Sequence, residues 1–358
     1  EITWRDWSSD VCSSDLDATC VDIDAEDLSG IAKFAGENKI DFAVVAPDDP
    51  LVMGCVDMLE SEGIPCFGPD KKAAIIEGSK AFSKELMKKY GIPTAEYEVF
   101  DTQEAALEYL RKCRIPVVIK ADGLAKGKGV IIAENREEAE KAVHDMMRDR
   151  IFGESGSRIV IEEFLEGPEV SILSFTDGKV LVPMVSSMDH KRALDGDRGL
   201  NTGGMGTVAP NPYYTDEIAA ICEEEILLPT VAAMNNEGRT FKGCLYFGLM
   251  ITENGPKVIE YNCRFGDPET QVVLPLLKSD LLDIMIHVAN GTLSDAKVEF
   301  SKDSACCVVM ASKGYPQGYE KGHPLSIPKD LPYVYVAGAK SEGGQTWQIG
   351  RASCRERV

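Results

Sequence analysis

Apolar positions alternate between helical and extended spacing over the first fifth of the chain. Residues 25–38 and 51–62 carry apolar side chains at the three- to four-residue spacing of amphipathic helices. Residues 41–46 (DFAVVA) and 64–67 are short apolar runs bounded by Pro or Gly, which is typical of buried parallel strands. This alternation predicts half of a doubly wound α/β domain, and we find no segment that would supply its first strand.

Beyond residue 78 the spacing predicts two regions of mixed helix and strand, residues 99–165 and 166–302, followed by a short β-rich segment from 303. The predicted strands are 117–120, 130–133, 158–162, 169–176, 179–184, 243–251 and 257–261, and the predicted helices are 79–90, 136–148, 215–235 and 276–290. We find no internal repeat and no low-complexity linker.

The two ends of the chain lack any such period. Residues 1–16 repeat Ser-Ser-Asp, residues 346–358 are basic, and together they hold all three Trp. Both resemble translated sequencing-adapter sequence, so we expect artefact tails and a reading frame cut at both ends; native disordered tails are the alternative. Without an apolar face they cannot offset an ordering cost of about 1–2 kcal/mol per residue. We therefore expect poor packing, exposed Trp and no regular strand partner for either tail.

Composition excludes several classes of function. The formal net charge of −21 argues against non-specific nucleic-acid binding. No run of 18 apolar residues predicts a membrane span. The 11 Cys form no C-x-x-C pair, which favours buried thiols in a reducing compartment over a disulfide framework, and so a cytoplasmic protein. The four His show no spacing typical of a metal site.

A glycine-rich segment carries the strongest chemical signal. KADGLAKGKGV places Gly123, Gly127 and Gly129 between two predicted strands, with lysines at 120, 126 and 128. Such a turn can present free N–H groups to a phosphate while the lysines supply positive charge. It is neither a Walker A loop nor a dinucleotide fingerprint. A solvent-exposed hairpin turn remains the alternative.

Two further segments place polar side chains at strand ends. In IEEFLEGPE, Glu162, Glu163 and Glu169 surround a Gly-Pro turn and can bind ribose or adenine, or form a solvated turn. In VIEYNCRFGDPE, Glu260 and Asn262 share one face of a strand. That pair suits Mg²⁺, which takes few protein oxygen ligands.

Arg264 follows the same strand and can clamp a phosphate or carboxylate, although the whole strand face can equally lie in water. Two polar segments, DHKR at 189–192 and NTGGMG at 201–206, are weaker signals, for which a lid or a surface loop is the default interpretation.

Taken in order, these motifs resemble the glycinamide ribonucleotide synthetase family of ATP-grasp ligases. The matching stretches are EGSKAFSK, KADGLAKGKGV, EEFLEGPEVS, DHKR, NTGGMG and EYNCRFGDPETQ, and the resemblance spans residues 17–345. It implies an ATP-grasp fold with an α/β N-terminal domain and a β-rich C-terminal domain, both truncated. The implied boundaries are an artefact tail at 1–16, an N-terminal domain at 17–79, a main lobe at 80–98 and 166–302, a lid lobe at 99–165, a C-terminal domain at 303–345 and a second tail at 346–358.

The resemblance also implies a role for each motif. ATP phosphates would contact Lys80, Lys120 and the loop containing Gly123, Gly127, Lys128 and Gly129. The adenine and ribose would contact Glu162, Glu163, Leu165 and Glu169, and Mg²⁺ or Mn²⁺ would bind Glu260 and Asn262. The substrates would meet Asp48, Asn201, Thr202, Gly203, Gly204, Arg264 and Asp267, with catalytic roles for Lys120, Arg264, Asp189 and Lys191.

The implied reaction joins glycine to phosphoribosylamine with ATP, through a glycyl phosphate, in purine synthesis. Asp48 stands where the family usually has Glu, and the Gly-rich loop that opens the family's sequences is missing. Two alternatives therefore stay open. One is another ATP-grasp enzyme such as a biotin carboxylase or an aminoimidazole ribonucleotide carboxylase. The other is an inactive ATP-binding fragment. The sequence does not indicate an oligomeric state.

Overall fold

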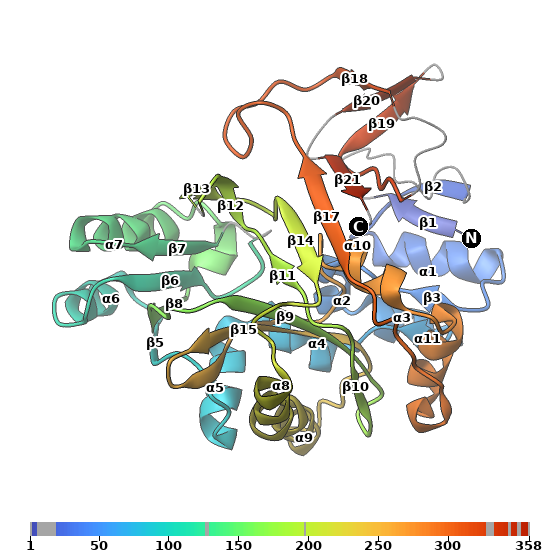
Figure 1. Cartoon of the computed structure of the whole chain (residues 1–358), viewed down its shortest axis with the longest axis horizontal. Helices are drawn as coiled ribbons and strands as arrows, with labels where there is room; N and C mark the ends of the chain where they lie inside the picture. Colours follow the sequence, from blue (N-terminus) through green and yellow to red (C-terminus); the bar gives the residue numbers. More distant parts are fainter. Residues whose placement is uncertain are drawn as a thin grey trace.

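The N-terminal segment contains short parallel strands covered by helices (Figure 1). The computed structural model describes residues 2–5, 19–125, 129–196, 198–326, 333–342, 345–348 and 352–356. In the N-terminal segment the strands pair in parallel as β1 (Ile2–Arg5) with β2 (Thr19–Asp24) and β3 (Ala43–Val44) with β4 (Cys66–Phe67). The helices are α1 (Leu28–Glu37), α2 (Asp48–Met53), α3 (Cys55–Ser61) and α4 (Lys71–Gly78).

A small lobe, residues 97–163, extends to one side of the molecule (Figure 1). Its antiparallel sheet has the order β5-β8-β6-β7, and helices cover one face. The elements are β5 (Tyr97–Phe100), α6 (Gln103–Leu110), β6 (Val117–Ala121), β7 (Val130–Ala133), α7 (Arg136–Val143), the π-helical turn η2 (His144–Arg148), η3 (Gly153–Gly156) and β8 (Ile159–Glu163). The buried apolar residues of this lobe form a cluster of their own.

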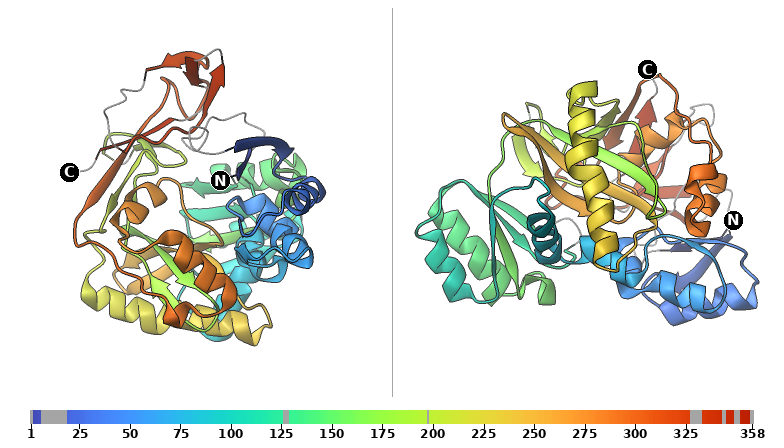
Figure 2. Two further views of the ribbon diagram at one scale, coloured as in Figure 1. Left: turned by 90° about the vertical axis from the view of Figure 1, so that its right-hand side faces the viewer. Right: turned by 90° about the horizontal axis from the view of Figure 1, so that it is seen from below.

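The large lobe comprises α5 (Lys80–Tyr90) and residues 166–302. Its central sheet is antiparallel, in the order β10-β9-β15-β16. These strands are β9 (Glu169–Thr176), β10 (Leu181–Pro183), β15 (Gly243–Thr252) and β16 (Gly255–Asn262). A long helical segment crosses one face of the sheet in the right-hand view of Figure 2. It consists of α8 (Asp216–Cys222), η4 (Glu223–Leu227) and α9 (Leu228–Asn236).

A second antiparallel sheet, β11-β14-β17-β21, lies on the other side of the central sheet. Its strands are β11 (Met188–Asp189), β14 (Gly206–Ala209), β17 (Ala305–Met310) and β21 (Ala352–Glu356). Beside them lie the hairpin β12 (Arg192–Leu194) and β13 (Arg198–Asn201), and the helices α10 (Thr270–Val273), η5 (Leu274–Leu276), α11 (Leu281–Asn290) and η6 (Leu293–Asp295). The last sheet is β18 (His323–Leu325), β20 (Gln345–Gln348) and β19 (Ala339–Glu342).

The structure confirms most of the predicted elements, with shifted ends. Strand 169–176 coincides with β9, and strands 117–120 and 130–133 lie within β6 and β7. The predicted helix 51–62 is divided into α2 and α3 because Gly54 takes a left-handed φ of 102° that ends the first helix. The predicted helix 276–290 begins only at Leu281, after the turn η5.

The expectation that the terminal segments have no regular strand partner is wrong. β1 pairs with β2, β20 pairs with β18 and β19, and β21 pairs with β17 over five residues. Trp347 is half-buried rather than exposed. Main-chain hydrogen bonding to an open strand edge does not depend on side-chain periodicity, so the sequence pattern could not exclude it. The artefact origin of these segments stays a prediction.

Candidate active site

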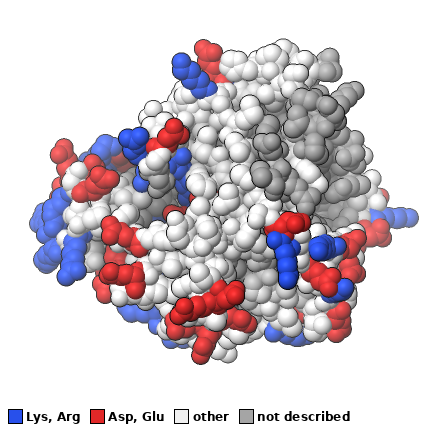
Figure 3. Space-filling model, in the orientation of Figure 1, with Lys and Arg blue, Asp and Glu red and all other residues white. Residues whose placement is uncertain are grey.

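The predicted site residues gather where the small lobe meets the large lobe. The ends of β6 and β8 face β16 there, and α5 lies alongside. Figure 3 shows the surface hollowed between the two lobes, with basic and acidic side chains around the hollow. Charged groups that lie so close together must be paired or must await a charged ligand.

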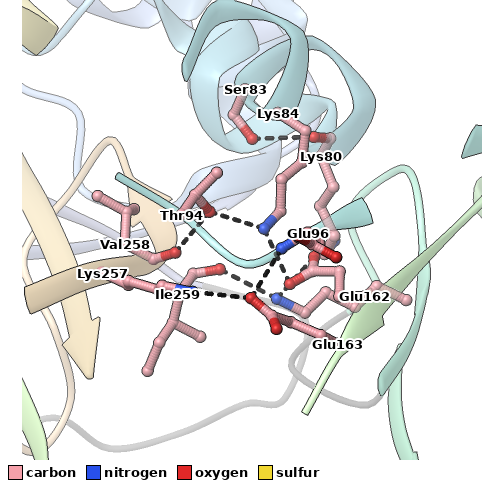
Figure 4. Close-up of polar contacts among 11 residues, drawn as sticks. Lys80, Ser83, Lys84, Thr94, Glu96, Glu162, Glu163, Lys257, Val258 and Ile259 are labelled. Carbon is pink, nitrogen blue, oxygen red and sulfur yellow. Dashed lines mark hydrogen bonds and ion pairs between the residues drawn. The ribbon is translucent and has the colours of Figure 1, made fainter. Parts of the chain in front are cut away.

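A buried carboxylate is held by two lysines from different lobes. The Oε2 atom of Glu162 lies 2.9 Å from the Nζ atom of Lys84, and its Oε1 atom lies 3.0 Å from the Nζ atom of Lys120. Lys84 also donates to the Thr94 hydroxyl at 2.8 Å (Figure 4). Lys120 donates to the Ile259 carbonyl at 3.0 Å. We call Lys84, Thr94, Lys120 and Glu162 the Glu162 network.

Burial is the largest influence on the lysines of this region. It lowers the pKa of Lys84 to about 8, against the opposing effect of Glu162. It also lowers the pKa of Lys80, for which Glu260 is the main opposing group. Both shifts reflect the cost of holding a positive charge away from water.

Glu163, next along β8, is paired separately. Its Oε1 atom accepts from Lys257 Nζ at 2.8 Å and from the Glu96 backbone N–H at 3.0 Å. Burial alone would raise the pKa of Glu163, but these donors hold that pKa below its ordinary value. Glu162 and Glu163 thus each join the small lobe to the large lobe through a lysine.

Asp122 joins the lobes through a helix cap. It follows β6, and its Oδ1 atom accepts from the Ser79 hydroxyl at 2.9 Å and the Ala81 backbone N–H at 2.7 Å, at the first turn of α5. Lys80 donates through its Nζ atom to the Gly123 carbonyl at 3.0 Å. The start of the glycine-rich segment is therefore bound to the N-terminus of α5.

Glu260 lies among several cations. The register of β16 against β15 shifts so that Ile259 has no partner, and this bulge presents the Ile259 carbonyl to Lys120. Burial alone would raise the pKa of Glu260, but positive charges around it lower that pKa: Lys191, Lys120, Lys80 and Arg264. In the described part of the chain, the Glu260 carboxylate makes no hydrogen bond or ion pair within 4.0 Å.

Arg264 is fixed by a buried acid from the N-terminal segment. Its Nη2 atom lies 3.2 Å from Glu77 Oε1, and Glu77 Oε2 accepts from the Cys263 N–H at 2.7 Å. Burial raises the pKa of Glu77 above its ordinary value, although Arg264 opposes it. Asp48, at the start of α2, lies close enough to help raise the pKa of Arg264.

Lys191 and Glu169 form a further ion pair of the site. Their Nζ and Oε2 atoms are 2.9 Å apart. Burial would lower the pKa of Lys191, but Glu169 and Glu260 hold it well above its usual value. Nearby, the buried Glu269 accepts from the Tyr246 hydroxyl at 3.0 Å, and burial raises the pKa of Glu269.

The segment 201–206 packs closely against this pair. Thr202 donates through its backbone N–H and hydroxyl to the Lys191 carbonyl. Gly204 has a φ of 103°, and a Cβ there would lie 2.6 Å from Asp189 Oδ1 and 2.5 Å from Pro268 Cδ. Only glycine fits, which brings the segment next to both Asp189 and the Asp267-Pro268 turn. Gly203 donates its N–H to the Tyr315 hydroxyl at 3.2 Å.

Some predicted residues lie elsewhere or cannot be placed. Gly127 and Lys128 fall outside the described residues. Asn201 is exposed on β13, away from the buried contacts, and Leu165 is half-buried beyond the end of β8. Gly129 accepts the Ala121 N–H at 2.8 Å, closing the base of the glycine-rich segment.

Sequence reasoning missed four residues of the site: Glu77, Lys84, Asp122 and Lys257. A signal for Lys84 was present, because it lies three residues from Ala81 and from Met87 on the buried face of an amphipathic helix. A charged residue on such a face requires a buried partner. Glu77, Asp122 and Lys257 carry no comparable local signal.

The oxygen ligands fit a magnesium ion in one respect. Glu260 and Asn262 are two residues apart near the end of β16, and a carboxylate and an amide oxygen suit Mg²⁺. Among the described residues, Asn262 Oδ1 accepts a long contact of 3.5 Å from Arg264. Within the described ranges, no group of three or more His, Cys, Asp and Glu forms a metal cluster, and no helix is long and apolar enough to cross a membrane.

Comparison with known proteins decides the family. Residues 78–270 match the phosphoribosylglycinamide synthetase ATP-grasp (A) domain, and residues 11–77 match the N domain of the same synthetase. The chain belongs to the phosphoribosylglycinamide synthetase family. The predicted resemblance and the predicted ATP-grasp fold are thereby confirmed.

Members of this family are similar in sequence to most of the chain. A phosphoribosylamine–glycine ligase of Clostridium acetobutylicum is 50% identical over 91% of this chain and 78% of its own length, and that of Haemophilus influenzae is 48% identical over 93% and 79%. The structure of the Thermotoga maritima ligase has a TM-score of 0.74 and 38% identity, covering 82% of this chain and 74% of that one. A Campylobacter jejuni biotin carboxylase, 15% identical with a TM-score of 0.76 over 99% of this chain and 82% of its own, shares the fold alone.

Proposed function

We propose that this chain is a phosphoribosylamine–glycine ligase. It joins glycine to phosphoribosylamine at the expense of ATP, giving glycinamide ribonucleotide, ADP and phosphate in purine synthesis. The observation that carries the proposal is the cluster of cations around Glu260, assembled from both lobes in a member of the phosphoribosylglycinamide synthetase family. Such a site suits a reaction between two anions, a nucleoside triphosphate and a carboxylate.

We assign the nucleotide to the cleft between the lobes. Lys80 and Lys120 bind its phosphates, supported by their position beside Glu260 and at the start of the glycine-rich segment. Glu162, Glu163 and Leu165 line the adenine pocket, and Glu169 meets the ribose. The half-exposed side chain of Glu169, which pairs with Lys191, supports a polar contact with a ligand.

Glu260 and Asn262 are the proposed ligands of Mg²⁺ or Mn²⁺. The metal would supply charge neutralisation between the phosphate groups. A carboxylate that several cations keep ionised, yet that makes no direct ion pair with the described side chains, is prepared for such a ligand.

The reaction needs an activated acyl group, because a carboxylate is a poor electrophile. An oxygen of the glycine carboxylate attacks the γ-phosphorus of ATP and ADP leaves, which forms glycyl phosphate. The amine of phosphoribosylamine then attacks the carbonyl carbon, phosphate leaves and the amine loses a proton. Lys120 neutralises the transferred phosphoryl group, while Arg264, Asp189 and Lys191 position the glycine and the sugar phosphate.

Asp48 and the 201–206 segment complete the proposed acceptor side. Asp48 lies near Arg264. Gly204 packs against Asp189 and Pro268, which brings Asp267, the residue before Pro268, close to this segment. We assign the ribose of phosphoribosylamine to Asp48 and the acceptor pocket to the 201–206 segment and Asp267. The exposed position of Asn201 makes it the weakest member of this set.

The test is the release of phosphate from ATP with each acceptor. We expect release only when glycine and phosphoribosylamine are both present, and none with bicarbonate, the substrate of a carboxylase. ADP binding without phosphate release under all conditions identifies an inactive nucleotide-binding fragment. A cytoplasmic location belongs to the same proposal, supported by free, buried cysteines such as Cys55, Cys222 and Cys244.

A further inference from the structure

Lys84 is a buried cation for which the proposed reaction has no direct use. Its side chain is only 2% exposed, and its Nζ atom is bonded to Glu162 and Thr94. Figure 4 shows it between α5 and Glu162. A buried charge is costly, so its presence calls for a role beyond packing.

Glu162, the partner of Lys84, also pairs with Lys120 and so competes with a bound phosphate group for the positive charge of Lys120. The two oxygens of Glu162 divide between Lys84 at 2.9 Å and Lys120 at 3.0 Å. With both lysines charged, the group carries one net positive charge. Without Lys84, the negative charge of Glu162 is balanced by Lys120 alone. The pair then has no net positive charge to attract a phosphate.

Thr94 fixes the geometry of this arrangement. Its hydroxyl accepts from Lys84 at 2.8 Å and donates to the Val258 carbonyl at 2.7 Å. Ile259, the next residue of β16, accepts from Lys120. Lys84, through Thr94, is thus linked to Val258, and Lys120 is bonded to Ile259. These two adjacent residues of β16 directly precede Glu260.

We propose that Lys84 is a positioning residue that offsets the charge of Glu162 and so leaves Lys120 free to bind the phosphates of the nucleotide. This inference rests on the nucleotide site proposed above. It assigns Lys84 no contact with ATP. It predicts that loss of Lys84 weakens binding of phosphate groups rather than binding of the adenosine.

The test compares ADP with AMP by calorimetry in one Mg²⁺-containing buffer. The ratio of their dissociation constants, Kd for AMP over Kd for ADP, measures the contribution of the β-phosphate. In Lys84→Met we expect this ratio to fall about tenfold, one ion pair's worth of affinity, while Kd for AMP changes by less than about threefold.

A double variant separates charge balance from structure. Lys84→Met with Glu162→Gln removes both charges and leaves Lys120 unopposed, so the ratio should return to within about threefold of the wild type. The matched control is Lys88→Met, because Lys88 lies one turn along α5 and is exposed. Its Nζ atom is 5.7 Å from the Tyr97 ring, as is that of Lys84. Lys88→Met should leave the ratio unchanged.

Thr94→Val provides a milder change in case Lys84→Met does not fold. It removes the hydroxyl that holds Lys84, and we expect the ratio to fall about threefold. An unchanged ratio in folded Lys84→Met, or in Thr94→Val where Lys84→Met does not fold, overturns the inference. So does a fallen ratio that the double variant fails to restore. Wild-type protein that binds no ADP overturns the nucleotide site itself, and this inference with it.

Discussion

The carboxylate of Asp122 lies 2.7 Å from the backbone nitrogen of Ala81, so a residue of the small lobe caps a helix of the large lobe. Asp122 directly precedes Gly123, the first glycine of the proposed phosphate-binding segment. The same side chain therefore anchors the start of that segment and stabilises the first turn of α5.

Substitution of Asp122 should affect stability and nucleotide binding together. Asp122→Ala should lower the free energy of unfolding by about 1–2 kcal/mol, the usual cost of a lost helix cap. It should also raise KM for ATP severalfold. Asp70→Ala is the control, because Asp70 caps α4 through the Ala73 N–H. Urea denaturation should show a similar loss in both variants, and a raised KM in Asp70→Ala would contradict the special role of Asp122.

Glu77→Gln should impair substrate binding by releasing Arg264. The neutral side chain still accepts a hydrogen bond from Cys263 but no longer holds the guanidinium by charge. We expect kcat/KM for phosphoribosylamine to fall at least tenfold while KM for ATP stays within about twofold. Glu77→Ala should in addition cost about 3 kcal/mol of stability, as the loss of one partner of a buried pair does. Steady-state kinetics decide, with the exposed Glu62→Gln as control.

Glu260→Gln should lower turnover by about two orders of magnitude or more, because Glu260 is a proposed ligand of the metal ion. Mn²⁺ affinity, measured by electron paramagnetic resonance in the presence of ADP, should fall in parallel. Glu253→Gln, at the exposed turn of the same hairpin, is the control. Normal turnover of Glu260→Gln at saturating Mg²⁺ would remove Glu260 from the ligand set.

The pH dependence of nucleotide binding should reflect Lys84. Because burial lowers the pKa of Lys84 to about 8, the side chain is charged at pH 7 and mostly neutral at pH 9. The charges that face it are Glu162 and Glu163 on β8 and Lys120 on β6. The ratio of Kd for AMP to Kd for ADP should therefore decline as the pH rises from 7 to 9 in the wild type.

Lys84→Met should show a low ratio that does not vary over this range. Lys80, whose pKa is also lowered by burial, is present in both proteins. A decline of equal size in wild type and Lys84→Met would therefore assign the titration to Lys80.

Local pattern predicted the fold well where the residues of a single element carry the signal. The apolar residues of the strand β9 and the amphipathic pattern of the helix α5 can be recognised in the sequence without further context. The break at Gly54 and the strand β2 could not be predicted this way. The first depends on a left-handed glycine, and the second on pairing with a segment that has no period of its own.

The candidate site was predictable in its motifs but not in its cross-connections. Lys120, Glu162 and Glu260 stand in recognisable stretches, and the structure brings them together. Glu77 and Arg264 are 187 residues apart, and their pairing depends on how α4 packs against β16. The spacing of apolar residues describes one element at a time, so it cannot predict contacts between elements. The roles of these residues, and the domain boundaries, remain predictions.

The apolar core of the small lobe is separate from the apolar cores of the rest of the molecule. Its buried cluster runs from Ala106 to Ile161, and neither of the other two clusters includes any residue of that range. The contacts described between the lobes are instead ion pairs and hydrogen bonds around Glu162, Glu163 and Asp122. A rotation of the small lobe would thus uncover little apolar surface and carry almost no change in heat capacity. The equilibrium between orientations of the small lobe should therefore depend on ionic strength far more than on temperature. Unfolding of either lobe, which exposes apolar surface, should depend strongly on temperature.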